Sequence, residues 1–239
     1  MTETLEVQPN SSFLETSERV QALGEKLSQL GFEGLTQEQR LEIIENATID
    51  DYKKSADLLH QLVAPYEDHA EHSGTVKIIN PDTNEVSHYT ATPEERDGIL
   101  QKALDNAKLV ASKFREEGGS LEDALWRCSN LAAFGLVLAH RYKDANGRTA
   151  RTMAELIFNG FDGSNPDLLK DLETLSANRT NEGFRINSYV PTGDWRDRAN
   201  EHPLDFLDAV AAIDVPLDHN SYIDASVDKF TTPRLRQRT

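Results

Sequence analysis

The sequence has a single cysteine and no long apolar run, and each shortage excludes a class of protein. One cysteine, Cys128, in 239 residues excludes an internal disulfide framework and a cysteine-rich zinc site. No apolar segment approaches the roughly 20 residues that a membrane-spanning helix needs. Residues 1–10 lack the basic and then apolar layout of a secretory signal. We therefore expect a soluble, cytoplasmic protein with no membrane partner, although the sequence leaves open export into another cell as an effector.

Basic residues are also few. The chain has 25 Lys and Arg against 41 Asp and Glu, which gives a formal net charge of -16. Binding to the phosphates of nucleic acid requires a positive surface, so we do not expect a nucleic-acid partner. The chain is nevertheless long enough to bury a sizeable core without disulfides or metals.

Apolar residues recur at helical spacing along most of the chain, which predicts a mainly α fold. Thr36 and Thr92-Pro93 are typical helix starts. The predicted helices span residues 11–30, 36–46, 49–63, 93–114, 121–139, 148–159, 165–175 and 203–213. The helix at 121–139 is apolar nearly all round, so we expect it at the centre of the domain.

One part of the chain has strand character instead. Residues 75–80 (TVKIIN) and 85–90 (EVSHYT) alternate between apolar and polar side chains, and the intervening residues 81–84 (PDTN) favour a turn. This pattern predicts a single β-hairpin.

The most informative segment is residues 140–151, HRYKDANGRTAR, between the central helix and the next one. Unpaired N–H groups and the helix dipole make a helix N-terminus a natural phosphate site, and Asn146-Gly147 lets an anion approach the backbone. Arg148 and Arg151 are three residues apart, so both can reach the same polyphosphate.

Two further residues of this segment suit nucleotide chemistry. Asp144 is a hard oxygen ligand beside the expected phosphate site, which suits Mg²⁺. His140 can accept a proton near neutral pH. Each residue alone is also what an ordinary polar turn contains. Their combination at a junction of buried helices favours a nucleotide site.

The segment resembles the signature of the Fic (Fido) family, His-x-Phe-x-Asp/Glu-Gly/Ala-Asn-Gly-Arg-x-x-Arg. The matching residues are His140, Asp144, Ala145, Asn146, Gly147, Arg148 and Arg151. Tyr142 stands where the family usually has Phe, and Arg141 replaces the common Pro. The resemblance covers roughly residues 50–189 and implies a Fic-type helical bundle in which residues 75–90 form the β-hairpin flap. The expected domains are an N-terminal helical extension at 1–48, a Fic core at 49–190 and a C-terminal extension with a basic tail at 191–239.

The resemblance implies a protein adenylyltransferase, a nucleotidyltransferase that moves AMP from ATP to a Tyr, Thr or Ser hydroxyl of a target protein. It makes His140 the general base and Asp144 the residue that holds Mg²⁺. The residues it assigns to ATP are Ala145, Asn146, Gly147, Arg148 and Arg151. The flap would bind the target by strand addition. Its expected contact residues are Ile78, Ile79, Asn80, His88 and Tyr89.

Two alternatives stay open. The pair Ala145-Asn146 is similar to the Doc branch of the family, which phosphorylates its target and has Lys where this chain has Gly147. The second alternative is a catalytically degenerate Fic-fold binding protein. The intact His140, Asp144 and Arg151 argue against it.

No segment strictly matches the family's inhibitory motif Ser/Thr-x-x-x-Glu-Gly/Asn. We therefore expect any inhibitor to be a separate antitoxin-like protein, as in a toxin–antitoxin pair.

Other candidates are weaker. His60, His69 and His72 suggest a metal site, but the last two lie in an acidic segment and are more simply solvated surface residues. Cys128 falls on the apolar helix, where a free cysteine is usually inert packing. The aromatic residues expected in the core are Trp126, Phe134, Phe158 and Phe161.

Overall fold

The structure, a computed structural model, is mainly helical, as predicted. It describes residues 25, 28–29, 31–64, 69–75, 77–79, 86–160 and 202–212, and of 77–79 and 86–89 it describes the backbone alone. The elements are α2 (Gln37–Asn46), α3 (Ile49–Val63), β1 (Lys77–Ile79), β2 (Val86–Tyr89), α4 (Pro93–Glu117), α5 (Leu121–Ala139), α6 (Asn146–Asn159) and α9 (Pro203–Ala211). The predicted helix at 165–175, and nearly all of that at 11–30, lie outside the described residues.

The helices begin where the local sequence supplies a cap. Thr36, Thr48 and Thr92 each accept a backbone N–H three residues on, and the side chain at that position binds the Thr backbone in return. These capping boxes satisfy N–H groups that have no partner within the helix. Pro93 follows Thr92 at the first helical position, where proline is well tolerated. The predicted starts of α2, α3 and α4 are therefore confirmed.

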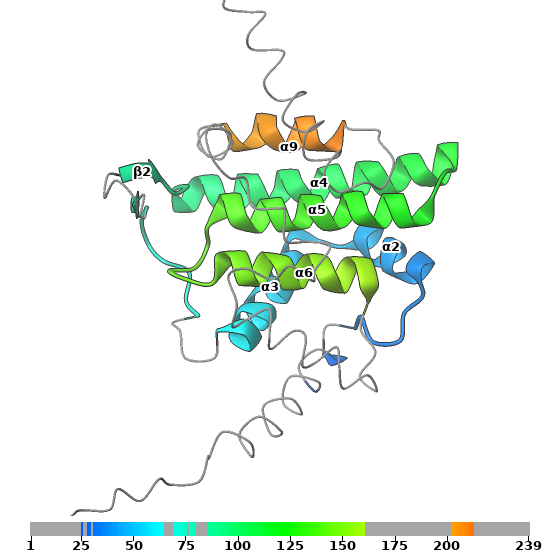
Figure 1. The fold of residues 1–239 in the computed structure, drawn as a ribbon, viewed down its shortest axis with the longest axis horizontal. Helices are drawn as coiled ribbons and strands as arrows, with labels where there is room; N and C mark the ends of the chain where they lie inside the picture. The colour runs from blue at the N-terminus through cyan, green and yellow to red at the C-terminus, as the bar shows by residue number, and fades with distance from the viewer. Residues whose placement is uncertain are drawn as a thin grey trace, which may run out of the picture.

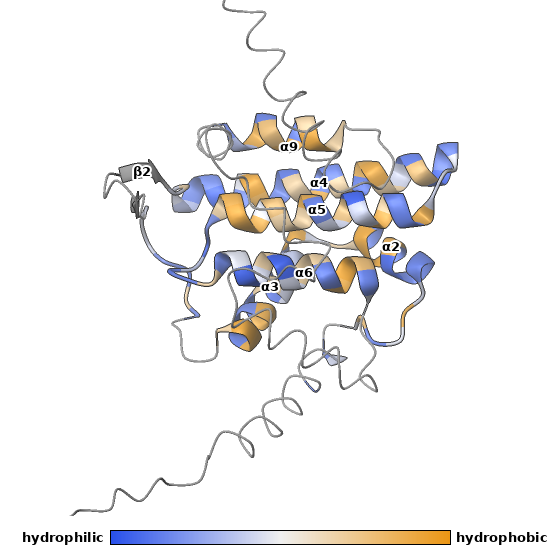
Figure 2. Ribbon diagram, viewed as in Figure 1, coloured by the Kyte–Doolittle hydropathy of each residue, from blue (hydrophilic) through white to orange (hydrophobic). Residues whose placement is uncertain are grey.

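Helix α5 lies at the centre of the bundle, between α4 and α6, and α9 covers α4 and α5 from the other side (Figure 1). Figure 2 shows apolar residues along much of α5, in keeping with a helix that is buried nearly all round. Trp126, Phe134 and Phe158 are buried as predicted, whereas Phe161 lies outside the described residues. The ring of Phe134 packs edge-on against Phe206 of α9, with 5.0 Å between the ring centroids.

A glycine sets how closely the helices approach α5. A Cβ atom at Gly135 would lie 2.5 Å from the Cβ of Ala103 on α4 and 2.8 Å from the hydroxyl of Tyr52 on α3. Both distances are below van der Waals contact, so a larger residue would push the helices apart. Because Gly135 lies only five residues before His140, this close packing helps to fix where the end of α5 lies.

Helices α2 and α9 belong to the sequence regions expected to be extensions, and both bury side chains in the same core as α4 and α5. Leu41 of α2 and Phe206 of α9 are fully buried there. The expected domain boundaries at residues 48 and 190 stay predictions. Among the helices that the structure describes, none combines the length and the apolar character needed to span a bilayer.

Two short antiparallel strands occupy the place of the predicted hairpin. Lys77 pairs with Tyr89, Ile78 with His88 and Ile79 with Val86, and the register shifts between Ile78 and Ile79. The strands lie at the same end of the bundle as the loop that joins α5 to α6 (Figure 1). Their role as a flap stays a prediction.

Candidate functional site

The loop of residues 140–145, which joins α5 to α6, has a strained residue at each end. His140 has φ 46° and ψ 54°, and Ala145 has φ 60° and ψ 8°. Within the described part of the chain, they are the only non-glycine residues with positive φ. Such a conformation costs an L-residue about 1–2 kcal/mol and persists only where the surroundings fix it. Strain of this kind concentrates at functional sites.

Asn146 closes the loop from within. Its side-chain oxygen accepts the backbone N–H of Tyr142 at 2.9 Å, and its side-chain nitrogen donates to the carbonyl of the same residue at 2.6 Å. The side chain is buried. The Asn146 side chain, which the resemblance assigns to ATP, is therefore bonded to the backbone of Tyr142 in this structure. It holds the loop in its tight form, and α6 begins at this residue, two positions earlier than predicted.

Tyr142 and Arg141, where the loop differs from the Fic signature that it resembles, share one carboxylate of α3. The Tyr142 hydroxyl donates to Asp57 at 2.6 Å, and the Arg141 guanidinium lies 3.3 Å from the other oxygen of Asp57. The ring of Tyr142 is buried. Burial, and then the bond to Asp57, raises the pKa of Tyr142. Glu71 lies 3.4 Å from Arg141 on its other side.

His60 supports the loop from α3. Its ring stacks on Tyr142 with 3.8 Å between centroids and 16° between planes. Its Nε2 lies 3.1 Å from the carbonyl oxygen of Asp144, and its Nδ1 lies 2.9 Å from Nδ1 of His69. A carbonyl only accepts, so Nε2 carries the proton and Nδ1 accepts from His69. Burial lowers the pKa of His60.

The expectation that His69 and His72 are solvated surface residues is wrong for His72, which is buried, as is the neighbouring His60. For His60 the sequence contained a usable signal, since it follows Ala56 by four residues on the buried face of α3. Among the described residues, no group of three or more His, Cys, Asp or Glu side chains could hold a metal ion. Cys128 is also buried, which raises the pKa of its thiol to about 12 and leaves it unreactive near neutral pH.

Asp144 points its carboxylate outward at the start of α6. One oxygen accepts the N–H of Ala145 at 2.6 Å, and the other lies 3.6 Å from the guanidinium of Arg148. Arg148 also donates to the carbonyl of Val63 at 3.1 Å. Mg²⁺ is commonly held by one or two carboxylates together with substrate phosphates and water. A single exposed carboxylate therefore fits Mg²⁺ only in the company of bound phosphate.

Helix α6 begins unlike the other described helices. Each of α2, α3, α4, α5 and α9 has an acid in its first turn, but α6 has none. Like α9, α6 also lacks a side-chain cap from any described residue. Acidic groups normally offset the positive end of the helix dipole. Here the first two turns carry Arg148 and Arg151 instead. The first two turns of α6 therefore carry two arginines and no acid up to Thr152, and the nearest carboxylate in the sequence is that of Asp144, just before the helix.

Arg151 is half-buried, and no hydrogen bond or ion pair joins its guanidinium to another described residue. Burial, and then the charge of Arg148, lowers the pKa of Arg151. A half-buried cation beside another cation is unfavourable unless an anion joins them.

The conformation and packing of the fold do not require a glycine at Gly147. Of the atoms that the structure describes outside its own helix backbone, a Cβ there would meet only the terminal nitrogen of Arg151, at 3.4 Å, and φ is not positive. Alanine would even suit the helix better by about 0.5–1 kcal/mol. Gly147 is half-buried and brings no side chain over the backbone N–H groups at the start of α6.

His140 lies across the loop from α6, as the residue that ends α5. Its side chain is half-buried, and its ring centroid is 6.4 Å from that of His72. The expected flap contacts remain predictions, because the side chains of Ile78, Ile79, His88 and Tyr89 lie outside what the structure describes, as does the whole of Asn80.

No family model matches the chain, and no curated protein matches it. One solved structure that it resembles is the crystal structure of a Fic family protein from Desulfovibrio desulfuricans G20. The sequence identity is 14% and the TM-score is 0.33, and the match covers 94% of this chain but 64% of that one. The chain therefore spans less than two thirds of that protein's length.

Proposed function

We propose that the chain is a Fic-type nucleotidyltransferase that transfers AMP from ATP to a hydroxyl group of a target protein. The observation that carries the proposal is the start of α6. It lacks the acid found in the other described helices, it has a glycine that the fold does not require, and it places Arg151 without a partner among the described residues. Together these features suit a polyphosphate.

Several groups of the site bind the nucleotide or its metal ion, and one residue, His140, moves a proton. The N–H groups at the start of α6, with Arg148 and Arg151, bind the phosphates. Asp144 would hold Mg²⁺ against them, and the ion would neutralise part of their charge. Because the Asn146 side chain is bonded to the Tyr142 backbone, its part is to shape the loop.

In the proposed reaction the target hydroxyl oxygen bonds to the α-phosphorus of ATP. The bond from that phosphorus to the oxygen bridging to the β-phosphate breaks, and pyrophosphate leaves. His140 takes the proton of the attacking hydroxyl. Holding hydroxyl and nucleotide in line supplies much of the rate, as in other transfers at phosphorus.

The test uses the full chain with a lysate, Mg²⁺ and ATP labelled at either the α- or the γ-phosphate. We expect α-label to appear on protein and to be lost in His140→Ala and Arg151→Gln. Arg115→Gln is the matched control, because Arg115 is an exposed arginine that pairs with Glu45 away from the loop. Transfer of γ-label instead would favour the Doc-like phosphotransferase. If folded protein transfers neither label, the proposal fails and the binding-protein alternative gains.

A further inference from the structure

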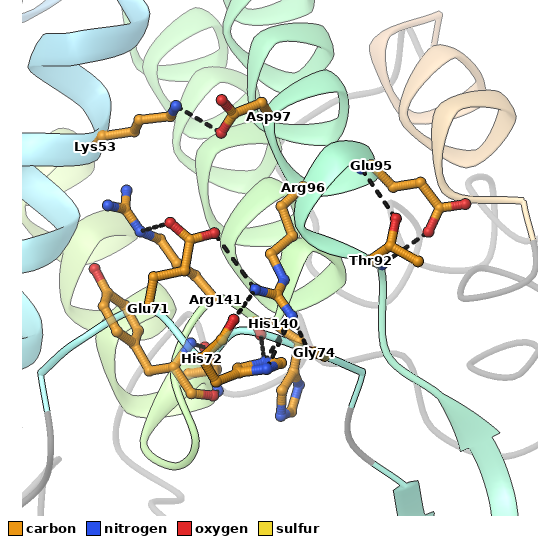
Figure 3. Close-up of polar contacts among 12 residues, drawn as sticks. Lys53, Glu71, His72, Gly74, Thr92, Glu95, Arg96, Asp97, His140 and Arg141 are labelled. Carbon is orange, nitrogen blue, oxygen red and sulfur yellow. Dashed lines mark hydrogen bonds and ion pairs between the residues drawn. The ribbon is translucent and has the colours of Figure 1, made fainter.

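Arg96 is a fully buried cation in the first turns of α4. Its Nη1 donates to the carbonyl of His72 at 2.5 Å and lies 3.4 Å from the carboxylate of Glu71, and its Nη2 donates to the carbonyl of Gly74 at 2.5 Å (Figure 3). Burying a guanidinium is costly, and the positive end of the α4 dipole adds to that cost. Among the described residues, the partners of Arg96 all lie at 71–74, so its evident effect is to fix that segment.

The segment that Arg96 fixes presents the ring of His72 to the end of α5. Nη2 of Arg96 is 2.9 Å from Nδ1 of this ring and 3.0 Å from Nε2, so the guanidinium lies against the ring between its two nitrogens. Nε2 of His72 is 2.8 Å from the carbonyl oxygen of His140 (Figure 3). The carbonyl can only accept, so Nε2 carries the proton and donates it.

His72 binds two successive carbonyl groups. Besides the bond to His140, its backbone N–H donates to the carbonyl of Arg141 at 3.3 Å. These carbonyls follow the end of α5, where the helix offers them no partner. They belong to the turn in which His140 takes its left-handed conformation. The two bonds from His72 thus oppose the relaxation of that strained residue.

We propose that Arg96 and His72 form a clamp that positions His140 for proton transfer. Arg96 holds residues 71–74, His72 holds the backbone of His140 and Arg141, and the backbone of His140 directs its side chain. Both clamp residues act through His140 and touch no reacting atom, so they are positioning residues. The catalytic consequence rests on the proposed function, whereas the clamp itself rests on the contacts above.

The decisive variants separate the donated bond from the bulk of the ring. His72→Phe keeps a ring and removes Nε2–H, while His72→Gln restores a donor at a similar reach. We expect His72→Phe to lower kcat for transfer of α-label by about 10- to 100-fold, the usual effect of misplacing a catalytic group by an ångström. KM for ATP should stay at the wild-type value, because the clamp does not bind nucleotide. His72→Gln should recover much of the lost rate.

Arg40 offers a matched control for Arg96. It is also a buried arginine, and it donates to the carbonyls of Leu35, Ile157 and Phe158, near the far end of α6. Arg96→Met should reduce kcat as His72→Phe does. Arg40→Met should lower stability and leave kcat unchanged at a temperature where both variants are folded. An equal loss of kcat in both arginine variants would overturn the proposal, because it would show a general effect of stability.

Hydrogen exchange tests the clamp without any activity. We expect His72→Phe to speed amide exchange across residues 138–143 by about tenfold, the loss expected for one hydrogen bond, with α4 unchanged. Unchanged exchange there would overturn the clamp, whatever the activity. If the wild-type chain transfers no α-label but exchange responds as expected, the proposed function fails while the clamp stands. Wild-type kcat in folded His72→Phe would refute the positioning role of His72.

Discussion

Gly147→Ala separates what the fold needs at the start of α6 from what a bound nucleotide would need. The substitution adds one methyl group, and the terminal nitrogen of Arg151, at 3.4 Å, is the one described neighbour within 4 Å outside the helix backbone. That is an ordinary contact with the flexible end of a side chain. We therefore expect the variant to fold normally, to gain stability and to lose activity.

The two effects have opposite signs and can be estimated. Replacing glycine by alanine in a helix raises the free energy of unfolding by about 0.5–1 kcal/mol. For a chain of this size the melting temperature should rise by about 1–4 °C. If the N–H groups at the start of α6 bind phosphate as proposed, crowding them removes a charge-assisted hydrogen bond of about 1.5–3 kcal/mol. Transfer of α-label at limiting ATP should then fall by about 10- to 100-fold.

Gly98→Ala is the matched control, because Gly98 is an exposed glycine of α4 and no described residue outside its own helix lies within 4 Å of an added Cβ. It should give a similar rise in melting temperature with wild-type transfer. The assay pairs thermal unfolding with initial rates over a range of ATP concentrations. Wild-type kcat/KM for ATP in Gly147→Ala would refute the argument that this glycine serves a phosphate. Marked destabilisation of Gly147→Ala would show that the packing at residue 147 does not accommodate a methyl group.

Gly135→Ala should lower the free energy of unfolding by about 1–3 kcal/mol in urea titrations, because the new methyl group overlaps two neighbouring helices; an unchanged midpoint would contradict this. Tyr142→Phe keeps the stack on His60 and loses only the bond to Asp57, so calorimetry should show a loss of about 1 kcal/mol, against about 3–5 kcal/mol for Tyr142→Ala. Equal losses would refute the importance of the stack. The pKa of His60 is lowered in the folded chain, so its contribution to stability is complete above the unfolded-state pKa of about 6.5 and is lost as the pH falls below it. Between pH 7 and pH 5 the wild type should therefore lose more stability than His60→Gln, by at most about 1.4 kcal/mol per pH unit. Parallel pH profiles of the two proteins would contradict a lowered pKa of His60.

The helices could be predicted because their signals are local. Thr36 and Thr92 are followed three residues later by the side chains that complete their capping boxes, and Pro93 adds a second start signal. The start of α6 gave no such signal. Ala145 occupies the cap position in a left-handed conformation with no side-chain bond, and Asn146 is bonded to the loop. The early start of α6, at Asn146, follows from the geometry of the preceding loop, and the rules for helix caps do not predict it.

The surroundings of the loop depend on partners far away in the sequence. Asp57 binds Tyr142 across 85 residues and also lies 3.3 Å from the guanidinium of Arg141. His72 is held by Arg96 of α4 and in turn binds His140. Neither pairing has a periodic or motif-like trace in the sequence. The loop residues themselves were recognisable, whereas the residues that hold them in place were not.

Arg96 links the two ends of the hairpin segment. Gly74, whose carbonyl Arg96 binds, lies just before β1, and Arg96 itself lies in the helix that follows β2. The bond from Arg96 to Gly74 therefore holds the two ends of this segment together, close to the end of α5, where His72 binds His140. Shortening or replacing the chain between residues 77 and 89 should therefore leave the bonds of Arg96 to residues 72 and 74, and of His72 to the end of α5, in place.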